Sequence, residues 1–233
     1  MNIFDTIENN AIKNKYINNT AVTQITSANK IKAISYKELI DQSTKVSQLL
    51  LKLGIQSKDK IYISSSDSIN FITSFLGAIK VGIIPIPGNP ELPQNQTLHI
   101  LNDSSPSIIL SDKPLDIKEL KFSCLLYTNR NWKKLLSDIK IKKIKSVNTQ
   151  NNHVAFLIYS SGTTGLPKAI IHQHAIIENT YFLHKNILKL KTKDKIFTTS
   201  KLFFAYALGN NFFAPLIIGL NTIFNDNLIE NPN

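Results

Sequence analysis

One short stretch near the middle of the chain gathers the residues that could do chemistry: Tyr159-Ser160-Ser161-Gly162-Thr163-Thr164-Gly165-Leu166-Pro167-Lys168. It follows the apolar run at 154–158, which is typical of a buried strand. Glycines let the backbone approach a bound group, and hydroxyls and backbone N–H groups donate hydrogen bonds to anionic oxygens. The lysine adds a full positive charge. Strand, donor-rich loop and lysine together predict a site that holds a polyphosphate.

The stretch differs from two widespread phosphate-binding motifs. Gly162 and Gly165 are too close together for a Walker A loop, and Ala169 stands where that loop carries its metal-binding hydroxyl. The glycine spacing also differs from the G-x-G-x-x-G of dinucleotide-binding folds. Standard P-loop NTPase chemistry and Rossmann-type dinucleotide binding are therefore not favoured.

The elements that must position this stretch alternate between strands and helices. A hairpin is expected from the β-rich runs at 21–25 and 31–35. Further strands are expected at 60–64, 83–87, 107–110, 124–127, 154–158, 169–172, 195–199 and 221–224, and helices at 37–53, 68–81, 94–101, 175–190 and 208–218. Pro85 and Pro87 place their run at a strand end or a sheet edge. The alternation predicts an α/β fold, a layered sandwich with largely parallel sheets.

Length and composition narrow the class of protein. The 233 residues allow one large or two small domains, and no apolar run is long enough to cross a bilayer. A single cysteine, Cys124, excludes an internal disulfide, and the first residues lack the features of a signal peptide. We therefore expect a cytoplasmic protein.

The formal net charge of +11 raises nucleic acid as a partner. However, the lysines are spread along the chain, and the densest run, 140–145, has no aromatic residues interleaved for base stacking. This run falls within the polar stretch 129–152, which is the best candidate for a surface connection. We expect no nucleic-acid partner.

The phosphate-loop stretch resembles the signature loop of the adenylate-forming (AMP-dependent) synthetase and ligase superfamily at every defined position from Ser160 to Lys168. The segments 34–39, 75–87 and 167–174 resemble other family segments, in the expected order. Val81 and Ala169 stand where the family usually has alanine and glycine. The resemblance extends over nearly all of the chain.

The run Lys201-Leu202-Phe203-Phe204-Ala205-Tyr206-Ala207-Leu208-Gly209-Asn210 is more discriminating. It is similar to the K-L-F-F-A-Y-G-L-G-N stretch of benzoate–CoA ligases, with Ala207 in place of a glycine. The resemblance implies an acyl pocket lined by Phe204, Ala205, Tyr206 and Gly209. Aromatic walls beside a small residue would form a flat apolar slot for an aryl carboxylate. The alternative is that these aromatics are ordinary core residues.

The resemblance implies a reaction in which Mg²⁺-ATP activates a carboxylate as an acyl-adenylate, which then passes to the thiol of coenzyme A. By motif position, the ATP β- and γ-phosphates would be held by Ser160, Ser161, Gly162, Thr163, Thr164 and Gly165. Lys168 would either neutralise phosphate charge or brace the loop, and bracing is favoured. His172 and His174 are as consistent with packed or surface histidines as with site residues.

The family pattern continues beyond what this sequence contains. An aromatic-Gly-Thr-Glu segment, a ribose-binding aspartate, a hinge and a C-terminal domain with a catalytic lysine are not found within it. We therefore expect residues 1–233 to be an incomplete N-terminal AMP-binding domain, and we assign no catalytic residue and no metal ligand within it. The leading hypothesis is the N-terminal part of an acid–thiol ligase, inactive alone. The alternatives are a nucleotide-binding remnant and one chain of a split ligase.

Overall fold

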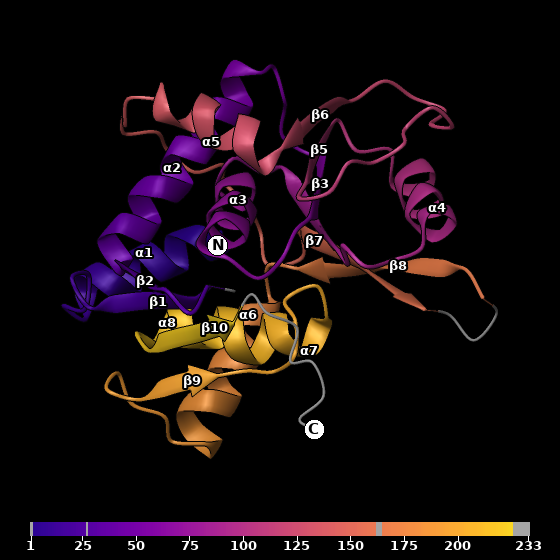
Figure 1. Ribbon diagram of the computed structural model, residues 1–233. Helices are drawn as coiled ribbons and strands as arrows, with labels where there is room; N and C mark the ends of the chain where they lie inside the picture. Colours follow the sequence, from indigo (N-terminus) through magenta and orange to yellow (C-terminus); the bar gives the residue numbers. More distant parts are fainter. Residues whose placement is uncertain (1, 27, 162–164, 226–233) are drawn as a thin grey trace.

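The protein folds into layers of sheet and helix, seen in the computed structural model of Figure 1, which describes residues 2–26, 28–161 and 165–225. One sheet has the order β2-β1-β10-β9, a second has the order β4-β3-β5-β6, and β7 pairs with β8 alone. The strands are β1 (Thr20–Ile25), β2 (Ile31–Ser35), β3 (Lys60–Ser64), β4 (Ile84–Gly88), β5 (Ile108–Ser111), β6 (Leu125–Thr128), β7 (Val154–Ser161), β8 (Pro167–Gln173), β9 (Lys195–Phe197) and β10 (Asn221–Asn225). The helices are α1 (Ile3–Lys13), α2 (Tyr36–Lys52), α3 (Ile69–Lys80), α4 (Gln94–Ser104), α5 (Asn129–Ser137), α6 (Ile176–Phe182), α7 (Ala205–Ala207) and α8 (Ala214–Ile218), with π-helical turns η1 (Leu183–Ile187) and η2 (Leu208–Phe213).

The sheet pairing confirms the predicted α/β fold. All pairs in the β4-β3-β5-β6 sheet are parallel, as are β1 with β10 and β10 with β9. Among the described strands, only the hairpins β1–β2 and β7–β8 are antiparallel. The proline-bearing strand β4 stands at a sheet edge, as expected for residues that lack a backbone N–H.

Alternation along the central strands divides the core between the two faces of a sheet. On β3, Ile61 and Ile63 enter the main core, whereas Tyr62 faces the smaller cluster beside α4. On β5, Ile109 likewise faces the smaller cluster, between two residues that face the main core. Successive side chains on a strand point to opposite faces, so burial on both faces requires helices on both sides. The helices α2 and α3 pack together over the main core, and α4 lies beside β8 (Figure 1).

Local capping explains where the main-core helices begin. The N-cap Ser35 and Glu38 form a capping box at the start of α2, with Ser35 N donating to the Glu38 carboxylate at 2.7 Å. Ser68 Oγ accepts the N–H of Phe71 at 3.1 Å and starts α3. The helix ends at Gly54 and Gly82 were also expected, and both glycines have positive φ.

Two helices were not foreseen. α1 begins at the N-cap Asn2 and buries Ile3, Phe4 and Ile7. α5 lies inside the stretch that was expected to be only a surface connection, and its Trp132 is fully buried, with Nε1 donating to Ser74 Oγ at 3.2 Å. Only one face of this short helix meets the core, so most residues around Trp132 are polar. The polar composition therefore did not indicate a helix. The helix expected at 175–190 ends earlier, with a π-helical turn to Ile187.

Two further expectations concern membrane-spanning helices and the single cysteine. In the described ranges, no helix combines the length and the apolar character that crossing a membrane requires. Cys124 is half-buried against the smaller core cluster, and burial raises the pKa of its thiol.

Candidate phosphate and acid site

The antiparallel hairpin β7–β8 carries the candidate phosphate loop. Ser160 lies opposite Lys168 and Ser161 opposite Pro167 in the strand register. The connection between β7 and β8 is shorter than the sequence indicated, because Tyr159, Ser160 and Ser161 still belong to β7. Gly162, Thr163 and Thr164 lie outside the described residues, so their assignment stays a prediction.

The returning arm of the hairpin is open to solvent. Gly165 has φ +101°, a conformation that side chains rarely adopt, and a Cβ there would meet nothing within 4 Å. Lys168 is exposed. Hydroxyl, backbone and ammonium donors beside open space fit an anionic group with several oxygens.

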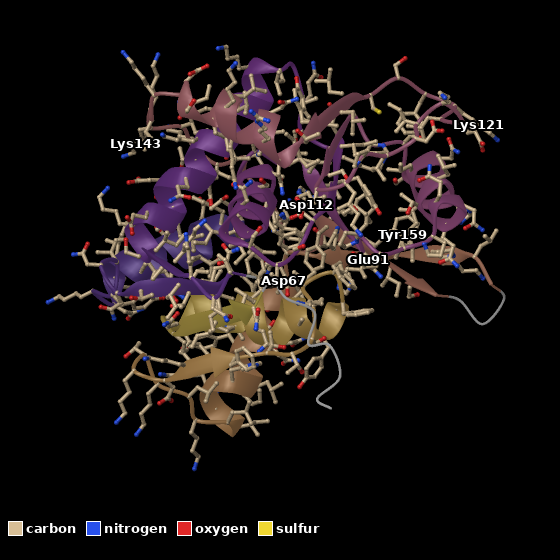
Figure 2. All side chains as sticks on the ribbon, viewed as in Figure 1. Asp67, Glu91, Asp112, Lys121, Lys143 and Tyr159 are labelled. Atoms are coloured by element: carbon tan, nitrogen blue, oxygen red, sulfur yellow. The ribbon has the colours of Figure 1, made fainter. Side chains whose placement is uncertain are left out.

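The helix α4 supports the base of this hairpin. His99 Nε2 is 3.0 Å from the carbonyl oxygen of Pro167. The hydroxyl of Tyr159, which Figure 2 labels between α4 and β8, donates to Asp103 Oδ2 at 2.5 Å. Burial and the Asp103 carboxylate raise the pKa of Tyr159, which keeps its hydroxyl protonated as the donor. A surface depression of about 430 Å³ lies between the two elements and is lined by His99, Asp103, Leu166, Pro167, Lys168 and Ala169. Sequence reasoning missed His99, Tyr159 and Asp103 as supports.

Both histidines whose role was left open, His172 and His174, pack against other residues. The His172 ring stacks on Phe156, with centroids 4.7 Å apart and planes at 6°. His174 is 2% exposed, and its Nδ1 accepts the backbone N–H of Ile3 at 3.3 Å. Burial lowers the pKa of both imidazoles, that of His174 to about 4. His174 thus joins β8 to α1 as a packed residue.

The candidate acid-binding segment begins before α7 and continues into η2. Phe204 is 54% exposed and Tyr206 is 70% exposed, so neither is an ordinary core aromatic. Ala205 is exposed as well, and Gly209 is half-buried. Leu202 and Ala207, on either side of the exposed aromatics, are fully buried. The segment is thus held in the core at both ends, with its aromatic middle at the surface.

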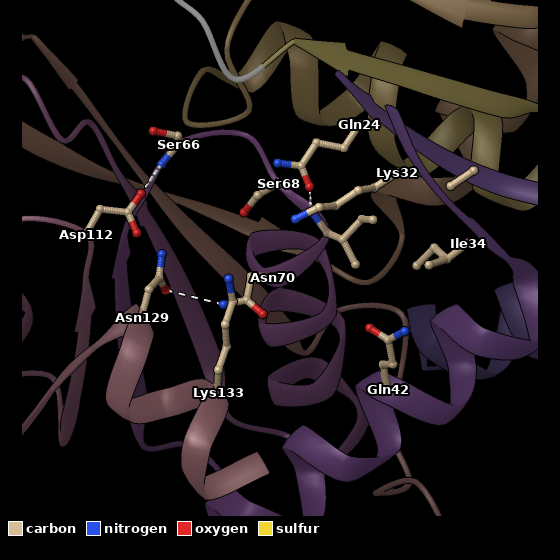
Figure 3. Close-up of a pocket in the computed structure, with 12 residues that line it drawn as sticks. Gln24, Lys32, Ile34, Gln42, Ser66, Ser68, Asn70, Asp112, Asn129 and Lys133 are labelled. Carbon is tan, nitrogen blue, oxygen red and sulfur yellow. Dashed lines mark hydrogen bonds between the residues drawn. The ribbon is translucent and has the colours of Figure 1, made fainter. Parts of the chain in front are cut away.

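A polar cavity that the sequence did not indicate lies at the carboxyl ends of β3, β5 and β6. It has a volume of about 640 Å³ and is lined mainly by polar side chains, among them Ser66, Asn70, Asp112, Asn129 and Lys133 (Figure 3). Ser66 N donates to Asp112 Oδ2 at 2.8 Å across its floor. In the order β4-β3-β5-β6, the chain reverses direction across the sheet between β3 and β5. Crevices at such switch points commonly bind ligands.

Comparison with known proteins decides the family. The family model described as AMP-binding enzyme matches residues 8–231. The chain belongs to the AMP-binding enzyme family. Within this family it is similar to a benzoate–CoA ligase of Thauera aromatica, with 32% identity over 76% of the chain and 36% of the relative. It is also similar to a 4-hydroxybenzoate–CoA/benzoate–CoA ligase of Rhodopseudomonas palustris, with 29% identity over 82% of the chain and 38% of the relative.

The fold agrees with the family assignment. The structure superimposes on a solved benzoate CoA ligase from Burkholderia xenovorans LB400 with a TM-score of 0.83 and 24% identity, over 97% of this chain and 46% of the other. The AMP-binding chain described here therefore spans less than half of the length of these relatives.

Proposed function

We propose that this chain supplies the phosphate-holding loop and part of the acid pocket of an ATP-dependent ligase that joins a carboxylate to a thiol. The observation that carries the proposal is the β7–β8 hairpin, in which Ser160 and Lys168 face each other beside a hydroxyl-rich turn. Directly opposite residues of an antiparallel pair project from the same face. The Ser160 hydroxyl and the Lys168 cation are therefore available to one ligand.

The proposed chemistry begins with attack of a carboxylate on the α-phosphorus of ATP, which forms an acyl-adenylate and releases pyrophosphate. Negative charge then gathers on the departing pyrophosphate, so fixed donors help most at that point. Ser160 to Gly165 supply these donors, and Lys168 supplies positive charge. Mg²⁺ would accompany ATP and offset phosphate charge, and we assign it no ligand in this chain. Coenzyme A is the proposed thiol acceptor.

An aryl acid such as benzoate is the proposed substrate class. Two features support it: the similarity to ligases named for benzoate and hydroxybenzoate, and the exposed aromatics Phe204 and Tyr206. Ala205, between them, leaves room for a flat ring, and Gly209 borders the same segment.

A direct test measures ATP binding to the purified chain by calorimetry. Thr163→Val removes one hydroxyl of the turn and should weaken ATP binding by about tenfold, the equivalent of one lost hydrogen bond. The matched control is Thr192→Val, at an exposed threonine in the turn before β9. Circular dichroism checks that both variants fold. Equal ATP affinity for parent and Thr163→Val would refute the loop assignment.

A second candidate is one chain of a two-chain ligase. It is favoured by large apolar side chains that stand exposed on α6, η1 and β9, such as Phe182, Ile187 and Phe197. Mixing with a separately produced polypeptide that carries the remaining family segments should then restore ligase activity. No gain of activity on mixing counts against this form.

A further inference from the structure

Asp67, in the loop between β3 and α3, is a buried carboxylate to which the proposed function assigns no role. It is 3% exposed, and its Oδ1 accepts the backbone N–H of Leu202 at 3.0 Å, across 135 positions of sequence. Figure 2 shows Asp67 where the N-terminal helices meet the C-terminal elements. The contact therefore joins the start of the candidate acid-binding segment to the loop that follows β3.

Burying a carboxylate is costly unless it is hydrogen-bonded or paired with a positive charge. Burial raises the pKa of Asp67 to about 6, while the Leu202 N–H and the charge of Lys201 act in the opposite direction. The two groups that lower the pKa of Asp67, the Leu202 N–H and the Lys201 ammonium, both belong to the start of the candidate acid-binding segment. The segment that Asp67 holds therefore also supplies the groups that offset the cost of burying Asp67.

The segment itself is fixed at its beginning and left open at its middle. Lys201 Nζ donates to the carbonyl oxygen of Asn225 at 2.9 Å, and Leu202 is fully buried. A turn follows, in which Phe204 N donates to the carbonyl oxygen of Lys201 at 3.0 Å. Phe204 and Tyr206 then stand exposed. Any shift of the Leu202 backbone would therefore move both aromatic side chains.

We infer that Asp67 is a positioning residue: its hydrogen bond to the Leu202 N–H sets the place of the Leu202–Tyr206 backbone and hence of the aromatic side chains of the acid pocket. The part of this inference that concerns the acid rests on the proposed function. The part that concerns the backbone does not. Asp67 acts through Leu202 and need not touch the substrate.

The first experiment needs no ligand. Amide hydrogen exchange and amide chemical shifts are measured by NMR on the isotope-labelled chain. Asp67→Ala should raise the exchange rate of the Leu202 amide by about tenfold and shift the amides at 203–206, since one hydrogen bond is lost. Asp67→Asn keeps an acceptor oxygen and should restore protection. The matched control is Asp59→Asn, which alters a carboxylate that instead accepts the N–H of Gln56.

A pH titration keeps the inference testable if Asp67→Ala does not fold. In the parent, the Leu202 amide shift should follow a titration with a midpoint near the pKa of about 6, and Asp67→Asn should abolish that titration. An untitrating Leu202 amide in the parent overturns the inference. So does unchanged Leu202 exchange in Asp67→Ala, or an equal increase in Asp59→Asn.

The second experiment follows the binding of benzoate, with acetate as the comparison acid, through the amide shifts at 203–206. Asp67→Ala should weaken benzoate binding by about tenfold, and Asp59→Asn should not change it. Unchanged benzoate affinity in Asp67→Ala overturns the acid part of the inference. If benzoate does not bind the parent, the aryl-acid function fails, while the exchange experiment still decides the positioning role.

Discussion

Ser160 and Lys168 lie directly opposite each other in the pairing of β7 with β8, and their side chains project from the same face of the hairpin. In the described part of the chain, the Lys168 ammonium has neither a hydrogen-bond partner nor an ion-pair partner. Gly162, Thr163 and Thr164, which Lys168 would brace, lie outside the described residues. Bracing of the loop and supply of charge to a bound phosphate therefore both stay predictions, which ATP affinity and stability measured on one variant separate.

The first prediction concerns Lys168→Gln. It should weaken ATP binding by about tenfold, because a charge-assisted contact is lost. The free energy of unfolding should change by less than about 0.5 kcal/mol, as is usual for an exposed site. Calorimetry and urea denaturation measure the two, with Lys185→Gln on η1 as an exposed-lysine control. A large loss of stability with unchanged ATP affinity would support bracing instead.

The second prediction concerns the contact of α3 with α2. A Cβ on Gly77 would lie 2.5 Å from the backbone oxygen of Ser43 and 2.7 Å from Val46 Cβ. Gly77→Ala should therefore lower the free energy of unfolding by about 1–3 kcal/mol, the usual cost of overpacking. Gly209→Ala is the control, since its Cβ would meet only Thr180 Cγ2 at 3.8 Å. Equal urea midpoints for both variants would contradict the close contact between α2 and α3 at Gly77.

The third prediction uses the raised pKa of Asp67, which is about 6 against an ordinary 3.8. Between these values the folded state binds more protons than the unfolded state, so this group's contribution to stability is lost as pH rises through the window. Asp67→Asn does not titrate and should gain about 1–3 kcal/mol over the parent between pH 4 and pH 7. Urea denaturation at several pH values measures the difference. A constant difference would contradict the raised pKa.

The fourth prediction has the opposite sign. The pKa of His174 is lowered from 6.5 to about 4, so the folded state binds fewer protons in this window, and stability is lost as pH falls through it. His174→Gln should reduce this acid loss by about 2–3 kcal/mol between pH 7 and pH 4. Since Asp67→Asn changes the profile in the other direction, each variant serves as a control for the other. An unaltered profile in His174→Gln would show that the imidazole is not buried as described.

The fifth prediction concerns the isolated 233-residue chain. It should not catalyse benzoate-dependent exchange of labelled pyrophosphate into ATP, because the family's adenine-binding segment and C-terminal lysine are not within its sequence. A complete benzoate–CoA ligase assayed alongside is the positive control. Exchange above the enzyme-free rate would show that these 233 residues form an acyl-adenylate unaided.

Local sequence was enough for features that depend on neighbouring residues. The glycine that follows the end of α2 is set by backbone sterics within a few positions. The edge position of β4 follows from prolines that cannot donate to a sheet. The family resemblance likewise rests on contiguous motifs, and the family match over 8–231 confirms it.

Other features depend on contacts that no local pattern reports. Hydrophobic character is consistent with Phe204 and Tyr206 as core residues or as pocket residues, and only the fold shows that both side chains are exposed. Trp132 lies in a polar stretch, and its burial depends on the position of Ser74 on α3.

By itself, then, the sequence determined the α/β class and the family, since these depend on short-range patterns of glycines, hydroxyls and apolar residues, and it predicted the place of a phosphate loop. Only the tertiary structure decided how α4 supports the base of the β7–β8 hairpin and how the candidate acid-binding segment is held. The bond from Leu202 to Asp67 joins residues 135 positions apart. Asp67 follows β3 and Leu202 follows β9, which belong to different sheets, so the bond depends on how the two sheets pack against the shared core.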